Sequence, residues 1–208
     1  MSATTLPLIM SATVHDYFRD QLSTSLHRQK VDVDESTQAY LINLLGAFTD
    51  PRQLFVETPE GLELRPLAFH YADAVNAPTL ERRNLALKKL GDVALFISGL
   101  FAGSLNRKLV DIDYYIAMGG MAYRDLHDLL QMRFDAPDYG PLFGELAEKF
   151  ARLVDVLAEV SDASNLGSHH DVLRLYEVWL RTGSEHARRR LHRLGIVPST
   201  NVTSRTRH

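Results

Sequence analysis

The chain contains no cysteine among its 208 residues. Disulfide bonds and metal sites built on thiolates are therefore excluded, and a reducing compartment suits the protein. A long hydrophobic run is also missing, because the most apolar stretch, residues 90–101, is interrupted by Gly91, Asp92, Ser98 and Gly99. A helix needs ~20 apolar residues to cross a bilayer, so no membrane association is expected.

Recognisable targeting and catalytic motifs are absent as well. Residues 1–10 lack the positive charge and the hydrophobic stretch of a secretory signal, so a cytoplasmic location is expected. The chain has no Gly-x-Ser-x-Gly motif, no glycine-rich nucleotide-binding motif and no Glu-x-x-His pair. These absences argue against an enzyme and predict no cofactor. A catalytic set assembled from distant helices would leave no such linear trace, so the question of an enzyme stays open.

The composition is typical of one globular domain. Hydrophobic residues make up 45% and charged residues 24% of the chain, which is enough apolar material for a substantial core. We expect a frayed leader over residues 1–12, a single helical domain over residues 13–197 and a disordered basic tail over residues 198–208.

Apolar residues recur at helical spacing along most of the chain and predict an all-α bundle of about eight helices. A first helix is expected from Thr13, and residues 49–64 are expected to be mostly loop. The helix over residues 79–102 is apolar on nearly every side, which is typical of a helix surrounded by others. Its main partner is expected over residues 111–132.

Four stretches carry a resemblance to known proteins: residues 40–48, 90–101, 110–119 and 175–184. Together they resemble an uncharacterised family of small all-helical bacterial proteins of about this chain's length. The resemblance covers most of the chain and implies a bacterial, cytosolic, all-α protein. It implies no activity, cofactor or catalytic residue.

The first candidate site is a pocket between the two central helices. Two of its acids, Asp111 and Asp113, lie at the start of the second central helix, where they also serve as caps, and its glycines lie on the apolar stripe of residues 111–132. Those glycines suggest a close helix crossing or room for a ligand. The candidate lining residues are Asp92, Asp111, Asp113, Tyr114, Gly119 and Gly120.

The second candidate is a divalent metal site. The sequence Leu126-His-Asp-Leu129 loosely resembles the central pair of all-α metal-dependent phosphohydrolases of the HD class, although the usual Gly-Lys continuation is absent. Imidazoles and carboxylates together can hold a metal ion that activates water. The ligands in this alternative are His70, His127, Asp128 and Asp171. Chance pairs on solvated helix faces explain the same residues.

The third candidate is the arginine-rich C-terminal region. Seven arginines and one acid occupy residues 181–208, although the net charge of the chain is −3. On the last predicted helix, Arg188, Arg189 and His192 share one side and are suited to contact phosphates or an acidic protein. No aromatic residue for base stacking accompanies them, so nucleic acid is the less favoured partner.

The sequence therefore favours a helical binding or regulatory protein. Its means of binding would be the pocket between the central helices or an apolar helix face that engages a protein partner, with self-association as a further possibility. The HD-like phosphohydrolase and the nucleic-acid-associated protein are the alternatives.

Overall fold

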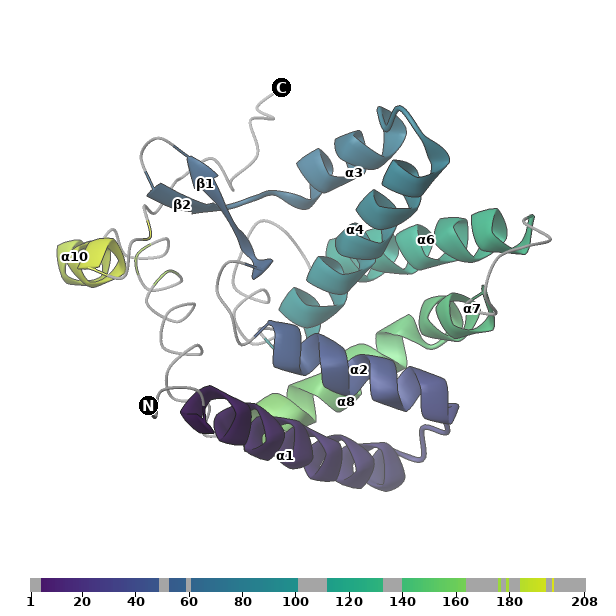
Figure 1. Cartoon of the computed structure of the whole chain (residues 1–208), viewed down its shortest axis with the longest axis horizontal. Helices are drawn as coiled ribbons and strands as arrows, with labels where there is room; N and C mark the ends of the chain where they lie inside the picture. Colours follow the sequence, from purple (N-terminus) through teal and green to yellow (C-terminus); the bar gives the residue numbers. More distant parts are fainter. Residues whose placement is uncertain are drawn as a thin grey trace.

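A computed structural model describes residues 5–48, 53–58, 61–100, 112–132, 140–163, 176, 179, 184–193 and 196. These residues form eight helices and one small sheet (Figure 1). The elements are α1 Thr5–Gln29, α2 Glu35–Ala47, β1 Phe55–Thr58, β2 Gly61–Leu64, α3 Leu67–Val75, α4 Leu80–Leu100, α6 Ile112–Gln131, α7 Gly140–Glu148, α8 Phe150–Ala163 and α10 Glu185–Arg193. The predicted all-α bundle is confirmed.

The helix α4 is the centre of the fold, as its sequence predicts. Every residue from 90 to 99 is buried, and the helix packs against α6, α3 and α8 (Figure 1). A helix that is apolar all round can bury that surface only among other helices. The predicted partner is α6, which buries Tyr115, Gly119, Ala122, Tyr123 and Leu126 on one stripe.

Two expectations about the N-terminal half are wrong. The first helix begins at Thr5, eight residues before Thr13, so part of the expected leader is helical. Residues 49–64 were expected to be mostly loop, but β1 and β2 pair there as an antiparallel hairpin in which Phe55 faces Leu64. Strands of four residues are too short for a two-residue periodicity to stand out against chance.

The start of α2 is fixed to α7 by one carboxylate. Glu145 accepts a hydrogen bond from the backbone N–H of Asp34 at 3.1 Å and another from the Lys149 ammonium at 2.7 Å. Lys149 also donates to the carbonyl of Asp32 at 2.7 Å. Tyr40 follows Asp34 by less than two helical turns, so these bonds help to set the position of Tyr40 in the bundle.

One glycine of α6 marks a tight crossing, and its neighbour does not. A Cβ added at Gly119 would lie 2.2 Å from the Phe150 ring and 2.8 Å from the Ala94 Cβ, closer than carbon atoms can approach. A Cβ added at Gly120 would meet nothing nearer than 3.7 Å. Of these two glycines of α6, only Gly119 is required for the crossing with α4 and α8.

We expect Gly119→Ala to lower the free energy of unfolding by about 1–3 kcal/mol, because the added methyl group overpacks a buried crossing. Gly120→Ala is the matched control. It should be neutral or raise stability by up to about 1 kcal/mol, since alanine is the better helix former. Urea unfolding followed by circular dichroism measures both. Equal effects of the two substitutions would contradict the crossing described above.

Candidate functional site

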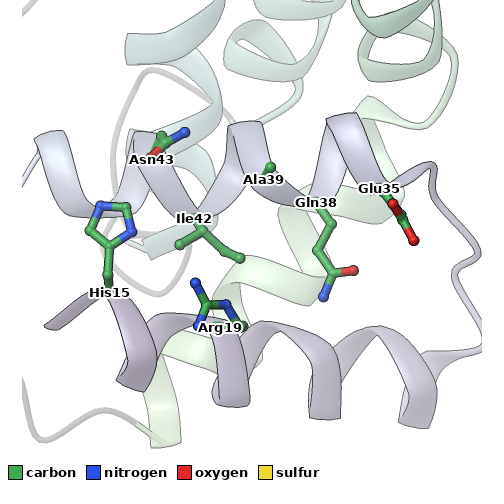
Figure 2. A pocket seen from close by; sticks show the side chains of 7 residues that line it. All are labelled: His15, Arg19, Glu35, Gln38, Ala39, Ile42 and Asn43. Atoms are coloured by element: carbon green, nitrogen blue, oxygen red, sulfur yellow. The ribbon is translucent and has the colours of Figure 1, made fainter. Parts of the chain in front are cut away.

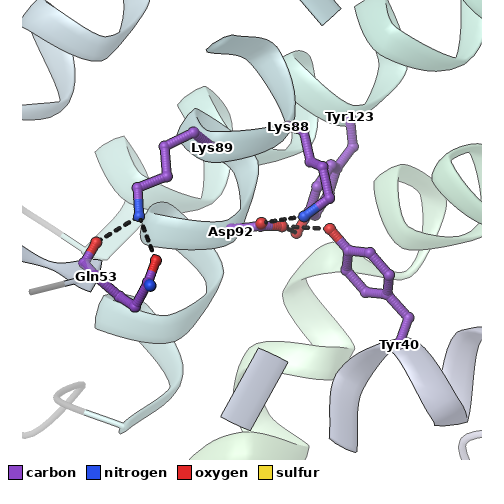
Figure 3. Close-up of polar contacts among 6 residues, drawn as sticks. All are labelled: Tyr40, Gln53, Lys88, Lys89, Asp92 and Tyr123. Carbon is purple, nitrogen blue, oxygen red and sulfur yellow. Dashed lines mark hydrogen bonds and ion pairs between the residues drawn. The ribbon is translucent and has the colours of Figure 1, made fainter. Parts of the chain in front are cut away.

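A buried carboxylate joins three helices of the bundle. Asp92 of α4 is only 6% exposed. It accepts hydrogen bonds from the hydroxyls of Tyr40 on α2, at 2.5 Å, and Tyr123 on α6, at 2.8 Å. The ammonium of Lys88, one turn earlier on α4, completes the set at 2.7 Å (Figure 3). Burying a carboxylate is costly unless it is paired and hydrogen-bonded, and these three donors meet that requirement.

The residue beside Asp92 makes room for one of these donors. A Cβ added at Gly91 would lie 2.4 Å from the Tyr123 ring, so only glycine lets the ring pack this close to α4. Tyr123 is fully buried at this position. The Tyr123 hydroxyl thereby reaches Asp92, so the absence of a Cβ at Gly91 permits the hydrogen bond to the next residue of α4.

The two tyrosines act as permanent hydrogen-bond donors. Burial is the main cause that raises the pKa of Tyr40 and of Tyr123 well above the ordinary value of 10.0, and the negative charge of Asp92 adds to it. Both hydroxyls therefore stay protonated at any physiological pH. Neither tyrosine is suited to act as a base.

A pocket of about 340 Å³ opens beside this cluster, between α2 and α4. Its volume falls at the small end of the range of roughly 300–1,000 Å³ that is usual for ligand sites. Apolar side chains and a few polar groups line it together: Tyr40, Asn43, Leu44, Ala47, Phe48, Gln53, Leu85, Lys88, Lys89 and Asp92.

The second ammonium group of the pocket has neutral partners. Lys89 donates to the backbone carbonyl of Gln53 at 2.5 Å and to its side-chain oxygen at 3.3 Å (Figure 3). Its Nζ also lies 5.1 Å from the centre of the Phe48 ring. Burial lowers the pKa of Lys89, the Asp92 charge opposes this, and the Lys88 charge lowers it further. The pocket thus holds two ammonium groups and one carboxylate.

Another hollow of about 580 Å³ lies between α1 and α2 (Figure 2). It is lined by His15, Arg19, Glu35, Gln38, Ala39, Ile42 and Asn43. The arginine of this hollow, Arg19, is largely exposed and forms an ion pair with Asp16 at 2.8 Å. No buried charged side chain points into this hollow from the described residues, so the pocket at Asp92 is the better candidate site.

The described members of the predicted pocket do not come together around one space. Asp92 is buried, whereas Asp113 and Tyr114 are exposed. Asp113 precedes Tyr123 by ten residues on α6, or about 15 Å at a rise of 1.5 Å per residue. The space expected beside Gly119 and Gly120 is occupied by Phe150. Asp111 lies outside the described residues.

The predicted metal ligands are not assembled by the described part of the chain. There, no group of three or more His, Asp or Glu residues is close enough to hold an ion. His127 Nδ1 lies 2.6 Å from the carbonyl oxygen of Gly140, Asp128 is exposed, and His70 is buried on a different helix, α3. Asp171 lies outside the described residues.

The basic candidates share one face of α10. Arg188, Arg189 and His192 are exposed, whereas Ala187 and Leu191 are buried. This agrees with the predicted helix and its predicted polar side. Whether phosphates or acidic proteins bind there stays a prediction.

The structure adds residues that the sequence did not single out for the site: Tyr40, Gln53, Lys88 and Lys89. Tyr40 fits an ordinary core stripe, and its contact with Asp92 spans 52 positions. The sequence contained one signal for this site. Lys88 and Asp92 have the four-residue spacing that is typical of ion pairs within a helix.

Comparisons with family models, curated proteins and solved structures give no match to the chain. Among the described residues, no helix is both long and apolar enough to pass through a membrane. The small size and the helical architecture agree with the resemblance noted from the sequence. The site has to be interpreted from its own geometry.

A buried histidine lies close to this region. His70 is 6% exposed, and its Nε2 has no hydrogen-bond partner among the described residues. Burial, followed by the charges of Arg65 and Lys89, lowers the pKa of His70 to about 4, against a weaker opposing effect of Asp73. His70 is therefore neutral at pH 7.

This burial makes stability depend on pH. An unfolded histidine gains its proton near pH 6.5 and the folded one only near pH 4. The unfolded state therefore binds more protons between these values, and stability falls as the pH is lowered. We expect a loss on the order of 3 kcal/mol from pH 7 to pH 4 from His70, at 1.36 kcal/mol per unit of pKa.

Urea unfolding over this pH range compares the wild type with His70→Leu and with His27→Gln, a control on an exposed histidine. Only His70→Leu should flatten the dependence. An unchanged slope in His70→Leu would show that His70 is not the group responsible.

Proposed function

We propose that the protein is a small-molecule-binding protein that uses the pocket between α2 and α4. The observation that carries this proposal is the buried Asp92, which accepts three hydrogen bonds and lines a pocket together with two lysines and apolar side chains. Mostly apolar pockets with a few convergent polar groups are the usual form of ligand sites. A bacterial cytosolic location, with a binding or regulatory role, forms part of the proposal.

The entrance of the pocket supports this interpretation. Leu85 lines the pocket, yet 66% of its surface is exposed. One exposed leucine is ordinary on a protein surface. Here it extends the apolar lining of Leu44 and Ala47 outward, so a ligand seated between α2 and α4 would cover it. Transfer of that apolar surface from water would contribute to affinity.

The proposal favours binding over catalysis. The pKa values of both tyrosines are raised, so they remain donors, and the Asp92 carboxylate already has three donors. A general base needs an accessible acceptor near its substrate. Asp92 does not provide one while these three bonds are in place.

A binding screen by NMR tests this function. Hexanoate, hexanamide, hexan-1-ol, hexylammonium and benzoate are added separately to labelled protein, and shifts are followed at Leu44 and Leu85. At least one compound should shift these signals. Ala47→Trp, which places a large ring at the pocket wall, should abolish the effect, and Ala68→Trp on the exposed side of α3 should not. Absence of any shift at the pocket, or shifts that survive Ala47→Trp, would refute the proposal.

A further inference from the structure

The lining of the pocket carries more positive than negative charge, because it has two lysines and one aspartate. Lys88 and Asp92 lie 2.7 Å apart and neutralise each other. Lys89 remains, and its hydrogen bonds go to two neutral oxygens of Gln53. Among the described residues it has no carboxylate within bonding distance. Within the described part of the chain, Lys89 is therefore the ammonium group of the pocket that has no carboxylate partner.

The partial burial of this charge favours an anion beside it. Lys89 is neither fully exposed nor fully buried, and burial is the first cause that lowers its pKa. A hydrogen bond to a charged acceptor is roughly twice as strong as one to a neutral acceptor. An anionic oxygen beside Nζ would offset the cost of removing the ammonium group from water better than the amide oxygens of Gln53 do.

The end of α2 limits how much negative charge the pocket can accept. Leu44, Ala47 and Phe48, which line the pocket, are at the C-terminal end of this helix. A helix C-terminus carries roughly half a negative charge. Against the single charge of Lys89, about half a positive charge remains. A monoanion is therefore favoured over a dianion such as phosphate near neutral pH.

The remaining walls define the other part of the ligand. Leu44 is buried, and Ala47 and Leu85 continue the apolar surface toward solvent. The ligand thus needs an apolar body next to its charged end. We infer that the pocket binds a small carboxylate with an apolar tail, whose carboxylate contacts Lys89 and whose tail covers Leu85. This inference rests on the proposed binding function and adds the chemical class of the ligand.

Isothermal titration calorimetry tests the charge requirement with matched probes. Hexanoate and hexanamide have the same length and differ in charge, hexylammonium carries the opposite charge, and inorganic phosphate is the dianionic control. Hexanoate should bind the wild type roughly 10- to 100-fold more tightly than hexanamide, as a charge-assisted hydrogen bond predicts. Lys89→Met should remove this difference while it leaves the affinity for hexanamide within about twofold. Arg82→Gln, on the exposed start of α4, should leave both affinities unchanged.

The other possible results distinguish a failure of the inferred ligand class from a failure of the proposed binding function. Equal affinities of the wild type for hexanoate and hexanamide would overturn the carboxylate class and leave a small-molecule pocket. Tighter binding of hexylammonium or phosphate would also overturn it. No binding of hexanoate or benzoate, with pocket shifts from hexanamide, hexan-1-ol or hexylammonium in the NMR screen, would refute the class alone. The comparison on the wild type decides the matter even where Lys89→Met fails to fold.

Discussion

Burial of the Asp92 carboxylate is the constraint on which the centre of this structure depends. A charge inside a helical core is tolerated only if donors come to it, and here they come from α2, α6 and the previous turn of α4. The two tyrosines thereby tie α2 and α6 to α4. Tyr40, Lys88 and Asp92 all line the pocket between α2 and α4, so the hydrogen bonds of Asp92 hold part of the pocket wall in place.

Most of the fold could be predicted from apolar spacing. Residues 79–102 and 111–132 were expected as the central pair, and α4 and α6 occupy them. Long periodic segments carry a strong signal because many positions repeat the same pattern. The hairpin at 55–64 was missed since two strands of four residues hold too few repeats. Pairing between strands also depends on the chain around them, which a local pattern does not contain.

The site was much less predictable than the fold. Asp92 was identified as a candidate, but its partners Tyr40 and Tyr123 lie 52 and 31 positions away. A helical pattern tells which face of each helix is buried and leaves open which side chains of two helices meet. Gly119 was interpreted both as a close crossing and as room for a ligand. Only the position of Phe150 decides between these, and it favours the crossing.

A double-mutant cycle between Asp92 and Tyr123 tests the central claim most directly. Urea unfolding gives the stabilities of the wild type, Asp92→Leu, Tyr123→Phe and the double variant. Asp92→Leu leaves the buried Tyr123 hydroxyl without its acceptor, and Tyr123→Phe removes one of the three donors of Asp92, whereas the double change removes both members of the bond. The account predicts that the double variant loses less stability than the two single variants lose together, by about 1 kcal/mol or more. Effects that add to within about 0.5 kcal/mol would contradict it, because they would show that Asp92 and Tyr123 do not depend on each other.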